Sequence, residues 1–511
     1  MAVKIILLVV FFAVMVAVGL YARKTATDVN GFVLGGRSVG PWLTAFAYGT
    51  SYFSAVVFVG YAGQFGFKYG LSATWIGLGN AIIGSLLAWV VLGRRTRVMS
   101  KHLDSATMPD FFGKRYHSKA IRIVSALIAF IFLIPYTASV YNGLSRLFGM
   151  AFNIPYSVCV AAMAILTGVY VILGGYMATA INDFIQGIVM LIGIVAVIVA
   201  VLNGNGGFYQ AYINLSAMES DIPVTAGLKG AFTSFFGPDP LNLMGVVILT
   251  SLGTWGLPQM VQKFYAIKDE KAIKTGTIIS TFFAIVVAGG SYFLGGFGRL
   301  TDVAEITVNG KLAYDAIIPT MLSKLPDILI GVVVVLVLSA SMSTLSSLVL
   351  TSSSTLTLDL IKGNFVKTMS EKKQVLVMRI FIVVFIVISV VIAMDPPTFI
   401  AQLMGISWGA LAGAFLAPLF YGLYWKGVTR GGVWAGFVSG VGITVANMVF
   451  NFMSPINAGA LAMIAGLVVV PLVSFITPKL DKGEIDFSFK CYDKKKVVEE
   501  KIALPDDVVQ E

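Results

Sequence analysis

The fold is decided by the stretch Tyr48-Gly49-Thr50-Ser51-Tyr52-Phe53-Ser54, which interrupts an apolar run near residues 42–66. A second apolar run, near residues 242–266, is interrupted by Ser251-Leu252-Gly253-Thr254-Trp255-Gly256-Leu257-Pro258-Gln259. Glycine weakens a helix, and proline removes a backbone donor and clashes with the preceding turn. Both stretches therefore predict a break in the middle of an apolar helix.

The composition places these broken helices in a lipid bilayer. Of the 511 residues, 57% are hydrophobic and only 12% are charged, whereas a soluble globular chain has about 25% charged residues. This excludes a cytosolic enzyme and a disordered protein. The net charge of +11 comes from basic residues in short gaps between apolar runs, which does not fit the basic face of a nucleic-acid binder. We expect an all-α membrane protein whose partner is the bilayer and not a nucleic acid.

Apolar runs of about 17–25 residues, the length that crosses a bilayer as a helix, occur thirteen times. The first has only Lys4 ahead of it and no small-residue cleavage site, which favours a span over a signal peptide. The thirteen runs lie near residues 2–21, 42–66, 72–93, 120–147, 156–175, 182–203, 242–266, 275–297, 326–357, 376–394, 398–424, 431–451 and 456–477.

The distribution of lysine and arginine predicts the orientation of the chain. Counted in alternate loops, 29 of the 36 basic residues fall on one side of the membrane, and basic loops stay in the cytoplasm. We therefore expect a multi-pass protein of the cell (plasma) membrane with its N-terminus outside and its C-terminus in the cytoplasm. Opposite-side termini require an odd number of spans, which thirteen satisfies.

The two breaks lie five spans apart, which predicts an internal repeat. Spans 2–6 and 7–11 form two units that each open with a broken helix, and a unit with an odd number of spans is inserted upside down relative to its copy. Inverted repeats with broken helices are typical of secondary transporters. The expected organisation runs from a first span and cytoplasmic loop (1–41) through repeat one (42–203), an extracellular loop (204–240) and repeat two (241–424) to two peripheral spans (425–477) and a cytoplasmic tail (478–511).

Span 9 carries the sharpest local signal for a binding site. Between residues 339 and 357, twelve of nineteen positions are Ser or Thr, and so many hydroxyls cannot all face lipid. The far half, 351–357, fits hydroxyls that bond carbonyls of their own helix. In the near half, four residues follow the spacing of one helical face, namely Ala340, Ser343, Thr344 and Ser347.

Uncharged oxygens on this face suit a hard cation better than nitrogen or sulfur would. A monovalent ion needs only a few neutral dipoles, so the lack of carboxylates favours sodium over calcium. Backbone carbonyls at the break of span 2, near Thr50 and Phe53, are expected to complete the shell. The sequence thus predicts a sodium site between spans 2 and 9.

One carboxylate, Asp183, stands at the expected inner start of span 6. An ionisable residue at a membrane boundary is a functional candidate, and an aspartate at a helix start is also a common N-cap. With Ser346 and Ser347 it forms a candidate second cation site or an inner exit.

At this point the residues resemble the sodium:solute symporter family over about residues 1 to 480. The resemblance rests on four stretches, of which the last is highly specific: Leu34–Ser38, Thr107–Phe112, Gly174-Gly175-Tyr176 to Asp183 and Gln186, and Ser341–Ser346. It implies the thirteen-span version of the leucine-transporter-like fold, with a ten-helix core of two inverted repeats. It implies no enzyme activity and no cofactor apart from Na⁺ as the coupling ion.

The resemblance also implies ligands for that ion. They are the backbone carbonyls of Thr50, Phe53 and Ala340 and the hydroxyls of Ser343 and Thr344, and the positions matching a second sodium site in some members are Asp183, Ser343, Ser346 and Ser347. Tyr52 stands where sodium/proline symporters carry an aspartate, and Gln259 stands where sodium/pantothenate symporters have a histidine. We expect a small solute, carboxylate-bearing like proline or pantothenate.

The sequence therefore predicts a sodium-coupled symporter that works as a monomer by alternating access. The expected solute contacts are Thr50, Tyr52, Ser54, Trp255, Gly256 and Gln259, with Tyr136 or Tyr141 of span 4 as a lid. A proton-coupled transporter of the same fold, with Asp183 as the carrier, is the main alternative. A channel would need a multi-chain pore or a filter ring, and a membrane-embedded sensor or enzyme would need an output domain or a catalytic pair.

Overall fold

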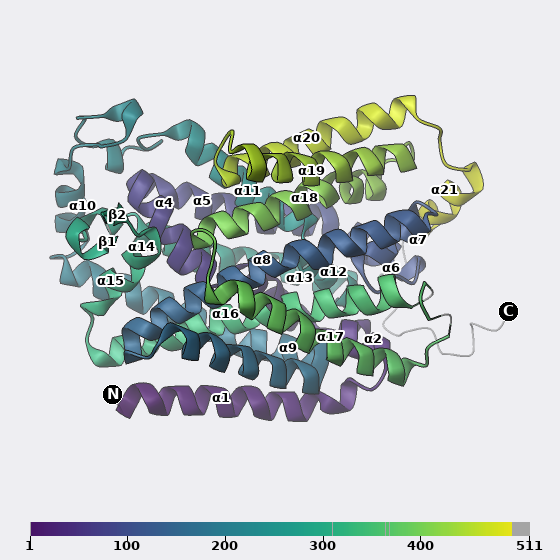
Figure 1. Cartoon of the computed structure of the whole chain (residues 1–511), viewed down its shortest axis with the longest axis horizontal. Helices are drawn as coiled ribbons and strands as arrows, with labels where there is room; N and C mark the ends of the chain where they lie inside the picture. Colours follow the sequence, from purple (N-terminus) through teal and green to yellow (C-terminus); the bar gives the residue numbers. More distant parts are fainter. Residues whose placement is uncertain (1, 309, 363, 367, 493–511) are drawn as a thin grey trace.

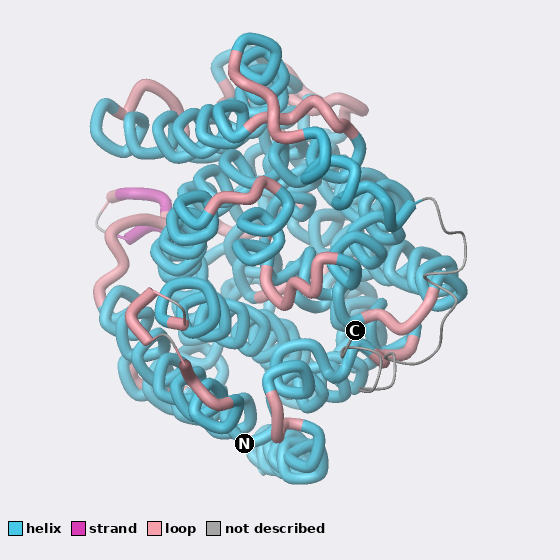
Figure 2. Tube along the Cα trace, turned by 90° about the vertical axis from the view of Figure 1, so that its right-hand side faces the viewer, coloured by secondary structure: helices cyan, strands magenta, loops and turns pink. Residues whose placement is uncertain are grey.

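Long helices run side by side along one common direction in the computed structural model of the chain (Figure 1). The structure describes residues 2–308, 310–362, 364–366 and 368–492. In the view turned by 90°, many helices are seen along their axes, and loops join them (Figure 2). Within these residues the only strands form a short antiparallel hairpin of β1 (Thr307–Val308) and β2 (Lys311–Leu312), so the expected all-α architecture is confirmed.

Each of the thirteen predicted runs is helical. The first half of the bundle contains α1 (Ala2–Ala22), α2 (Val29–Leu34), α3 (Pro41–Tyr52), α4 (Ala62–Tyr69), α5 (Thr74–Gly79), α6 (Arg94–His102), α7 (Met108–Arg115), α8 (Lys119–Phe152) and α9 (Tyr156–Gly204). Turns of π-helix, Val56–Tyr61, Asn80–Leu87 and Trp89–Gly93, extend α4, α5 and α6. The loop expected near 204–240 carries α10 (Phe208–Ala217).

The second half repeats this pattern. It contains α11 (Pro240–Gly256), α12 (Pro258–Ala266), α13 (Glu270–Ala284), α14 (Gly290–Gly295), α15 (Ile317–Ser323), α16 (Asp327–Thr355), α17 (Glu371–Met394) and α18 (Ile400–Tyr424). Further π-helical turns, Ile285–Gly289 and Leu356–Ile361, join α13 to α14 and extend α16. Three helices follow, α19 (Arg430–Phe450), α20 (Pro455–Ile476) and α21 (Lys482–Phe489).

Both predicted helix breaks are present. The first helix of one pair, α3, ends at Tyr52, and Phe53 is extended before helical turns resume at Val56. The other pair, α11 and α12, meets at an extended Leu257 and bends by 46°. Proline at the start of α12 needs no backbone donor there, which fixes where the second half begins.

The boundary between the spans predicted near 156–175 and 182–203 lies at Gly175, which places Asp183 within the second of them. The label α9 covers two helices that meet at this residue, whose φ of 53° and ψ of −146° are not helical. This conformation is open to glycine, and a Cβ would lie 2.7 Å from the carbonyl oxygen of Phe32. The second leg starts at the kink, so Asp183 lies inside a helix, and the N-cap interpretation was wrong.

Among the described residues, ten helices are long and apolar enough to cross a membrane, and eleven if the bent pair α11–α12 is one span. The two remaining predicted runs are both interrupted or short. One is the broken segment from α3 to α4, and the other is the first leg of α9, of which Tyr156–Val169 is a shorter apolar helix. The number of helices that can cross a membrane by length is therefore below thirteen, because one predicted span is interrupted and another is short.

The start of the predicted cytoplasmic tail (478–511) is folded against the bundle. Phe489 at the end of α21 is buried, and the Arg115 guanidinium lies 4.8 Å from the centre of its ring. Residues 493–511 lie outside the described part of the chain.

Two glycines bring α4 and α14 into backbone contact. A Cβ added to Gly295 would lie 2.0 Å from the Ala62 carbonyl oxygen, and one added to Gly66 would lie 2.0 Å from the Gly295 carbonyl carbon. Close packing of this kind lets helices approach without side chains between them. This contact joins α4, the second part of the first broken span, to α14, which follows the second broken span α11–α12.

At the end of the bundle that carries α10 and α15 (Figure 1), Asp315 joins three segments. Its carboxylate accepts from the Ile400 backbone N–H at 3.4 Å and lies 3.9 Å from Arg146. Burial raises the pKa of Asp315 to about 6, with Arg146 acting in the opposite direction.

We expect the folded protein to lose stability as the pH rises from 4 to 6 through this group. The folded state holds the Asp315 proton more tightly than the unfolded chain, so the stabilisation is complete below the unfolded pKa and is lost above about 6. From the ordinary value of 3.8, the difference corresponds to about 3 kcal/mol. Thermal unfolding midpoints are measured in detergent between pH 4 and 8. Between pH 4 and 6 the midpoint of Asp315→Asn should fall less than that of the parent protein. Exposed Asp395→Asn is the control, and equal curves for all three proteins would contradict the expectation.

Candidate functional site

Five oxygens meet where α16 passes the break after α3, and we call them the five-oxygen cluster. They are the carbonyl oxygens of Thr50, Phe53 and Ala340 and the hydroxyl oxygens of Ser343 and Thr344. Ser343 Oγ lies 3.0 Å from both the Thr50 and the Ala340 carbonyl. Thr344 Oγ1 lies 3.2, 3.4 and 3.1 Å from the carbonyls of Thr50, Phe53 and Ala340.

The local sequence explains this convergence. Residues three and four apart share a helical face, so α16 presents Ala340, Ser343 and Thr344 together. The end of α3 turns its last carbonyls toward that face because Phe53 leaves the helix. All five residues are buried, so the oxygens form a dry, neutral, oxygen-only group of the kind that suits a hard monovalent cation.

The hydroxyl of Ser341 also reaches the break, since Ser341 Oγ accepts from the Ala55 backbone N–H at 3.3 Å. The sequence pattern did not single out this serine, because it lies off the face of Ser343. The broken backbone is thus held to α16 from two directions.

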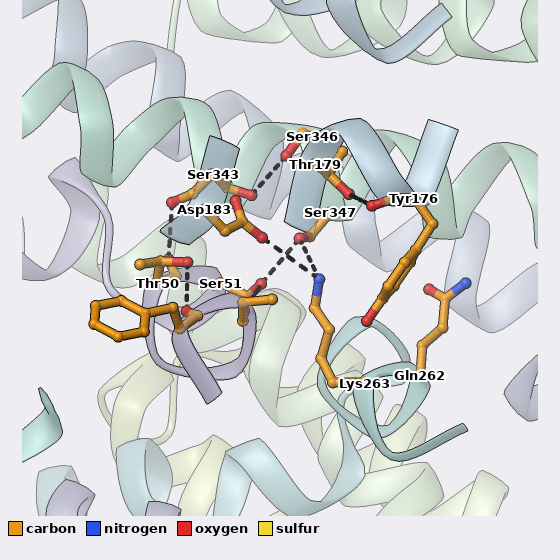
Figure 3. A network of polar contacts seen from close by, with 12 residues as sticks. Thr50, Ser51, Tyr176, Thr179, Asp183, Gln262, Lys263, Ser343, Ser346 and Ser347 are labelled. Carbon is orange, nitrogen blue, oxygen red and sulfur yellow. Dashed lines mark hydrogen bonds and ion pairs between the residues drawn. The ribbon is translucent and has the colours of Figure 1, made fainter. Parts of the chain in front are cut away.

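A second polar group lies beside the first, with a lysine at its centre (Figure 3). Lys263 of α12 donates to Ser347 Oγ at 3.0 Å, and its ammonium lies 3.9 Å from a carboxylate oxygen of Asp183. Ser51 and Ser347 share a hydrogen bond of 2.9 Å. We call Lys263, Asp183, Ser347 and Ser51 the Lys263 cluster.

Ser346 lies apart from this cluster. Its hydroxyl donates to the Ser343 carbonyl of its own helix at 2.9 Å (Figure 3). Of the three residues predicted for a second cation site, the structure therefore brings Asp183 and Ser347 to one lysine, while Ser346 is turned to the helix backbone.

Sequence reasoning missed Lys263, which was counted among the basic loop residues. It lies within α12, and its side chain is 3% exposed. An available signal was its place five residues after Pro258, on a helix that starts at a break; half-helices at breaks line binding sites.

Two of the expected solute contacts meet near the first break. The Tyr136 ring packs edge-on against Trp408 of α18, with ring centres 5.8 Å apart, and its hydroxyl faces the Ser54 side chain. Within the described residues, the Tyr136 hydroxyl and both amide atoms of buried Gln259 have no hydrogen-bond partner. Buried polar atoms without partners are rare, so these groups are available to a ligand.

Other expected solute contacts have different roles in the structure. Trp255 donates its indole N–H to the Ile83 carbonyl at 2.9 Å. Gly256 packs against α18, where a Cβ would lie 2.7 Å from the Ala412 Cα. Tyr141 faces Thr167 of α9, and its hydroxyl also has no hydrogen-bond partner among the described residues. The side chain of Tyr52 lies outside the described part of the structure.

A cavity of about 510 Å³ opens between α4, α11, α18 and α20 at the end of the bundle that carries α10. Its polar lining includes Gln64, Lys68, Asn242, Gln402 and Asn457. The cavity lies at the ends of α4 and α11 that are farther from the two helix breaks.

The opposite end of the bundle carries several contacts made by arginine side chains. Arg122 pairs with Asp359 at 2.9 Å and with Asp110 at 3.3 Å. Arg37 donates to the Ser105 carbonyl at 2.6 Å, and Arg97 to the Ile267 carbonyl at 2.5 Å. The bonds from Arg122 to Asp359 and from Arg97 to Ile267 join segments of the first half to segments of the second.

Comparison with known proteins gives a family and a fold. The model of the sodium:solute symporter family matches residues 32–440. The sodium/proline symporters of Staphylococcus aureus strains JH9 and NCTC 8325 are each 31% identical over 496 residues, covering 93% of this chain and 92% of theirs.

Two solved structures are similar in architecture. A Na⁺-coupled sialic acid symporter, in a substrate-bound outward-open state, gives a TM-score of 0.75 at 15% identity and covers 94% of this chain and 99% of its own. Mhp1, a nucleobase-cation-symport-1 family transporter in a closed conformation, gives 0.52 at 14% identity, with 89% and 97% covered. Both have the leucine-transporter-like fold, which confirms the expected fold class.

Proposed function

The chain belongs to the sodium:solute symporter family, and from this premise we propose that it imports a small organic solute, driven by sodium, through alternating access. The family and the fold make it a multi-pass membrane transporter rather than an enzyme. What remains is to assign the ion site, the solute site and the direction of transport to particular residues.

The five-oxygen cluster is the proposed sodium site. Its support is one observation, that two hydroxyls on α16 lie 3.0–3.4 Å from backbone carbonyls in a buried region, one from two carbonyls and the other from three. Two of those carbonyls come from the break after α3. A sodium ion held there would fix the shape of the break, and by thermodynamic linkage the ion and the solute raise each other's affinity by the same factor.

The proposed solute site lies next to the break. Tyr136 and Ser54 border one side, and Gln259 supplies an amide with both atoms unpaired among the described residues. The first backbone N–H groups of α12 follow the bend at Leu257, and a helix N-terminus favours a negative group. A small carboxylate-bearing solute, such as proline or pantothenate, fits this chemistry, and similarity to sodium/proline symporters supports that class.

The direction follows from the charge distribution. With the N-terminus outside and the C-terminus in the cytoplasm, the cavity bordered by Gln64 and Asn457 faces outward, and the Arg122 contacts close the cytoplasmic end. The chain is proposed to complete this cycle as a monomer.

Proteoliposomes holding the purified chain test the function. Labelled proline, pantothenate and short monocarboxylates are offered with an inward sodium gradient, with choline in place of sodium, or with a proton gradient alone. We expect uptake of one of them under the sodium gradient only. Uptake that persists without sodium and collapses with the proton gradient would contradict sodium coupling and favour Asp183 as a proton carrier.

Two buried tyrosines of α8 offer a matched test of the solute site. Tyr136→Phe is expected to raise the solute KM about 5- to 10-fold, the equivalent of one neutral hydrogen bond. Tyr141→Phe removes the same atom on the face toward Thr167 and should leave KM unchanged. Equal KM values for both variants and the parent protein would place the solute elsewhere.

A further inference from the structure

Among the described residues, Lys263 is the lysine most deeply enclosed by the helix bundle: 2% of its surface is exposed, and its side chain is 3% exposed. Burying an unpaired charge is costly, so a buried ammonium indicates nearby compensation. Here the compensation comes from Asp183, which is fully buried on the second leg of α9. The pair therefore joins the two halves of the bundle through a charge contact rather than through apolar packing alone.

The geometry around the ammonium is that of a cation shell. Lys263 Nζ donates to Ser347 Oγ at 3.0 Å, lies 3.9 Å from Asp183 Oδ2, and stands 5.0 Å from the centre of the Tyr176 ring. Ser51 bonds the same Ser347 hydroxyl from the end of α3. A carboxylate, a hydroxyl and an aromatic face thus surround one positive charge (Figure 3).

The same carboxylate and hydroxyl, Asp183 and Ser347, are the residues at which a second sodium ion was expected. Of the other two implied ligands, Ser346 donates to the Ser343 carbonyl, and the Ser343 hydroxyl belongs to the five-oxygen cluster. Neither carboxylate oxygen of Asp183 accepts a hydrogen bond from the described residues. The lysine thus brings a positive charge to Asp183 and Ser347, and the other two serines do not contact it.

We propose that the Lys263 ammonium takes the place of a second sodium ion, so that the chain couples one sodium ion to each solute. This inference rests on the proposed sodium symport. A tethered cation balances Asp183 in every conformation that keeps the two helices together, whereas a free ion would enter and leave with each cycle. Lys263 thereby sets the ion stoichiometry without contacting the solute.

The inference is tested by counting sodium ions. Purified chain is titrated with ²²Na⁺ in a scintillation proximity assay, and sodium-dependent uptake is measured in proteoliposomes. Because a Hill coefficient is limited by the number of sites, the parent chain should give about 1 and bind about one ion per chain. Lys263→Ala removes the ammonium from the shell and should give a Hill coefficient of about 2 and about two bound ions per chain. Its thermal unfolding midpoint should also rise more with sodium than that of the parent.

The double variant Lys263→Ala/Asp183→Asn should return to about one ion, because the freed shell then has no charge to hold a second. Lys268→Ala, a half-exposed lysine just after α12, is the control and should match the parent. One ion bound by both the parent and Lys263→Ala would overturn the inference while leaving sodium symport intact. Two ions bound by the parent would overturn it too, even if Lys263→Ala does not fold, whereas no sodium binding would instead defeat the proposed function.

Discussion

Alanine at Ser343 or at Thr344 is expected to raise the sodium concentration that half-saturates uptake by about 10- to 100-fold. Each substitution deletes one of only two side-chain oxygens in the five-oxygen cluster. A hydrogen bond or ligand to a charged group contributes about 1.5–3 kcal/mol, and about 1.4 kcal/mol corresponds to a tenfold change in affinity. Sodium titrations of uptake, at saturating solute, measure the effect directly.

The same helix provides the controls. Ser353 and Ser354 are buried serines of α16 that donate to carbonyls of their own helix, at 3.1 Å each. Alanine at either should leave half-saturation within about twofold, since these hydroxyls lie outside the cluster and surface or neutral changes are small. Unchanged half-saturation in both Ser343→Ala and Thr344→Ala would show that sodium binds elsewhere.

Gly295→Ala is expected to cost about 3 kcal/mol or more and to abolish most of the folded protein. Overpacking a well-filled interior costs this order of free energy, and the added Cβ would lie 2.0 Å from the Ala62 carbonyl oxygen. The obstacle is backbone, which cannot turn aside as a flexible side chain would. The yield of monodisperse protein on size-exclusion chromatography in detergent, and its unfolding midpoint, measure the loss.

Gly289→Ala is the matched control, because Gly289 lies six residues earlier in the same helical segment and a Cβ there would meet nothing within 4 Å. It should fold as the parent does, and replacing glycine by alanine at a helical position should stabilise the helix slightly. A Gly295→Ala protein as abundant and as stable as Gly289→Ala would mean that α4 and α14 separate easily.

The parts of the site that the sequence predicts are those set by local spacing. Ser343 and Thr344 share a face because they are neighbours on one helix, and the break at Phe53 follows from the glycine and polar residues around it. The pairing of these two segments was predicted because carbonyls freed at a helix break and a face of hydroxyls can bind one ion together, and the resemblance to a family implied the same pair.

The contact between Lys263 and Asp183 could not be predicted from local spacing. Their contact joins residues far apart in the chain, and the lysine looked like one of many basic residues at a cytoplasmic boundary. The position of Asp183 within its helix depends on the positive φ of Gly175, at which the two expected spans meet. Charge counting assumes that lysines lie in loops, so a lysine held inside the bundle escapes it.

The bonds within the five-oxygen cluster also bear on the half of the cycle in which nothing is carried. The carbonyls at the break accept hydrogen bonds from Ser343 and Thr344, so a transporter without sodium leaves neither carbonyl unpaired in a region of low dielectric. This self-solvation narrows the energy gap between the loaded and unloaded forms. In the proposed cycle, the empty carrier would then reset without recruiting water or a stray ion, which would protect the sodium gradient from leak.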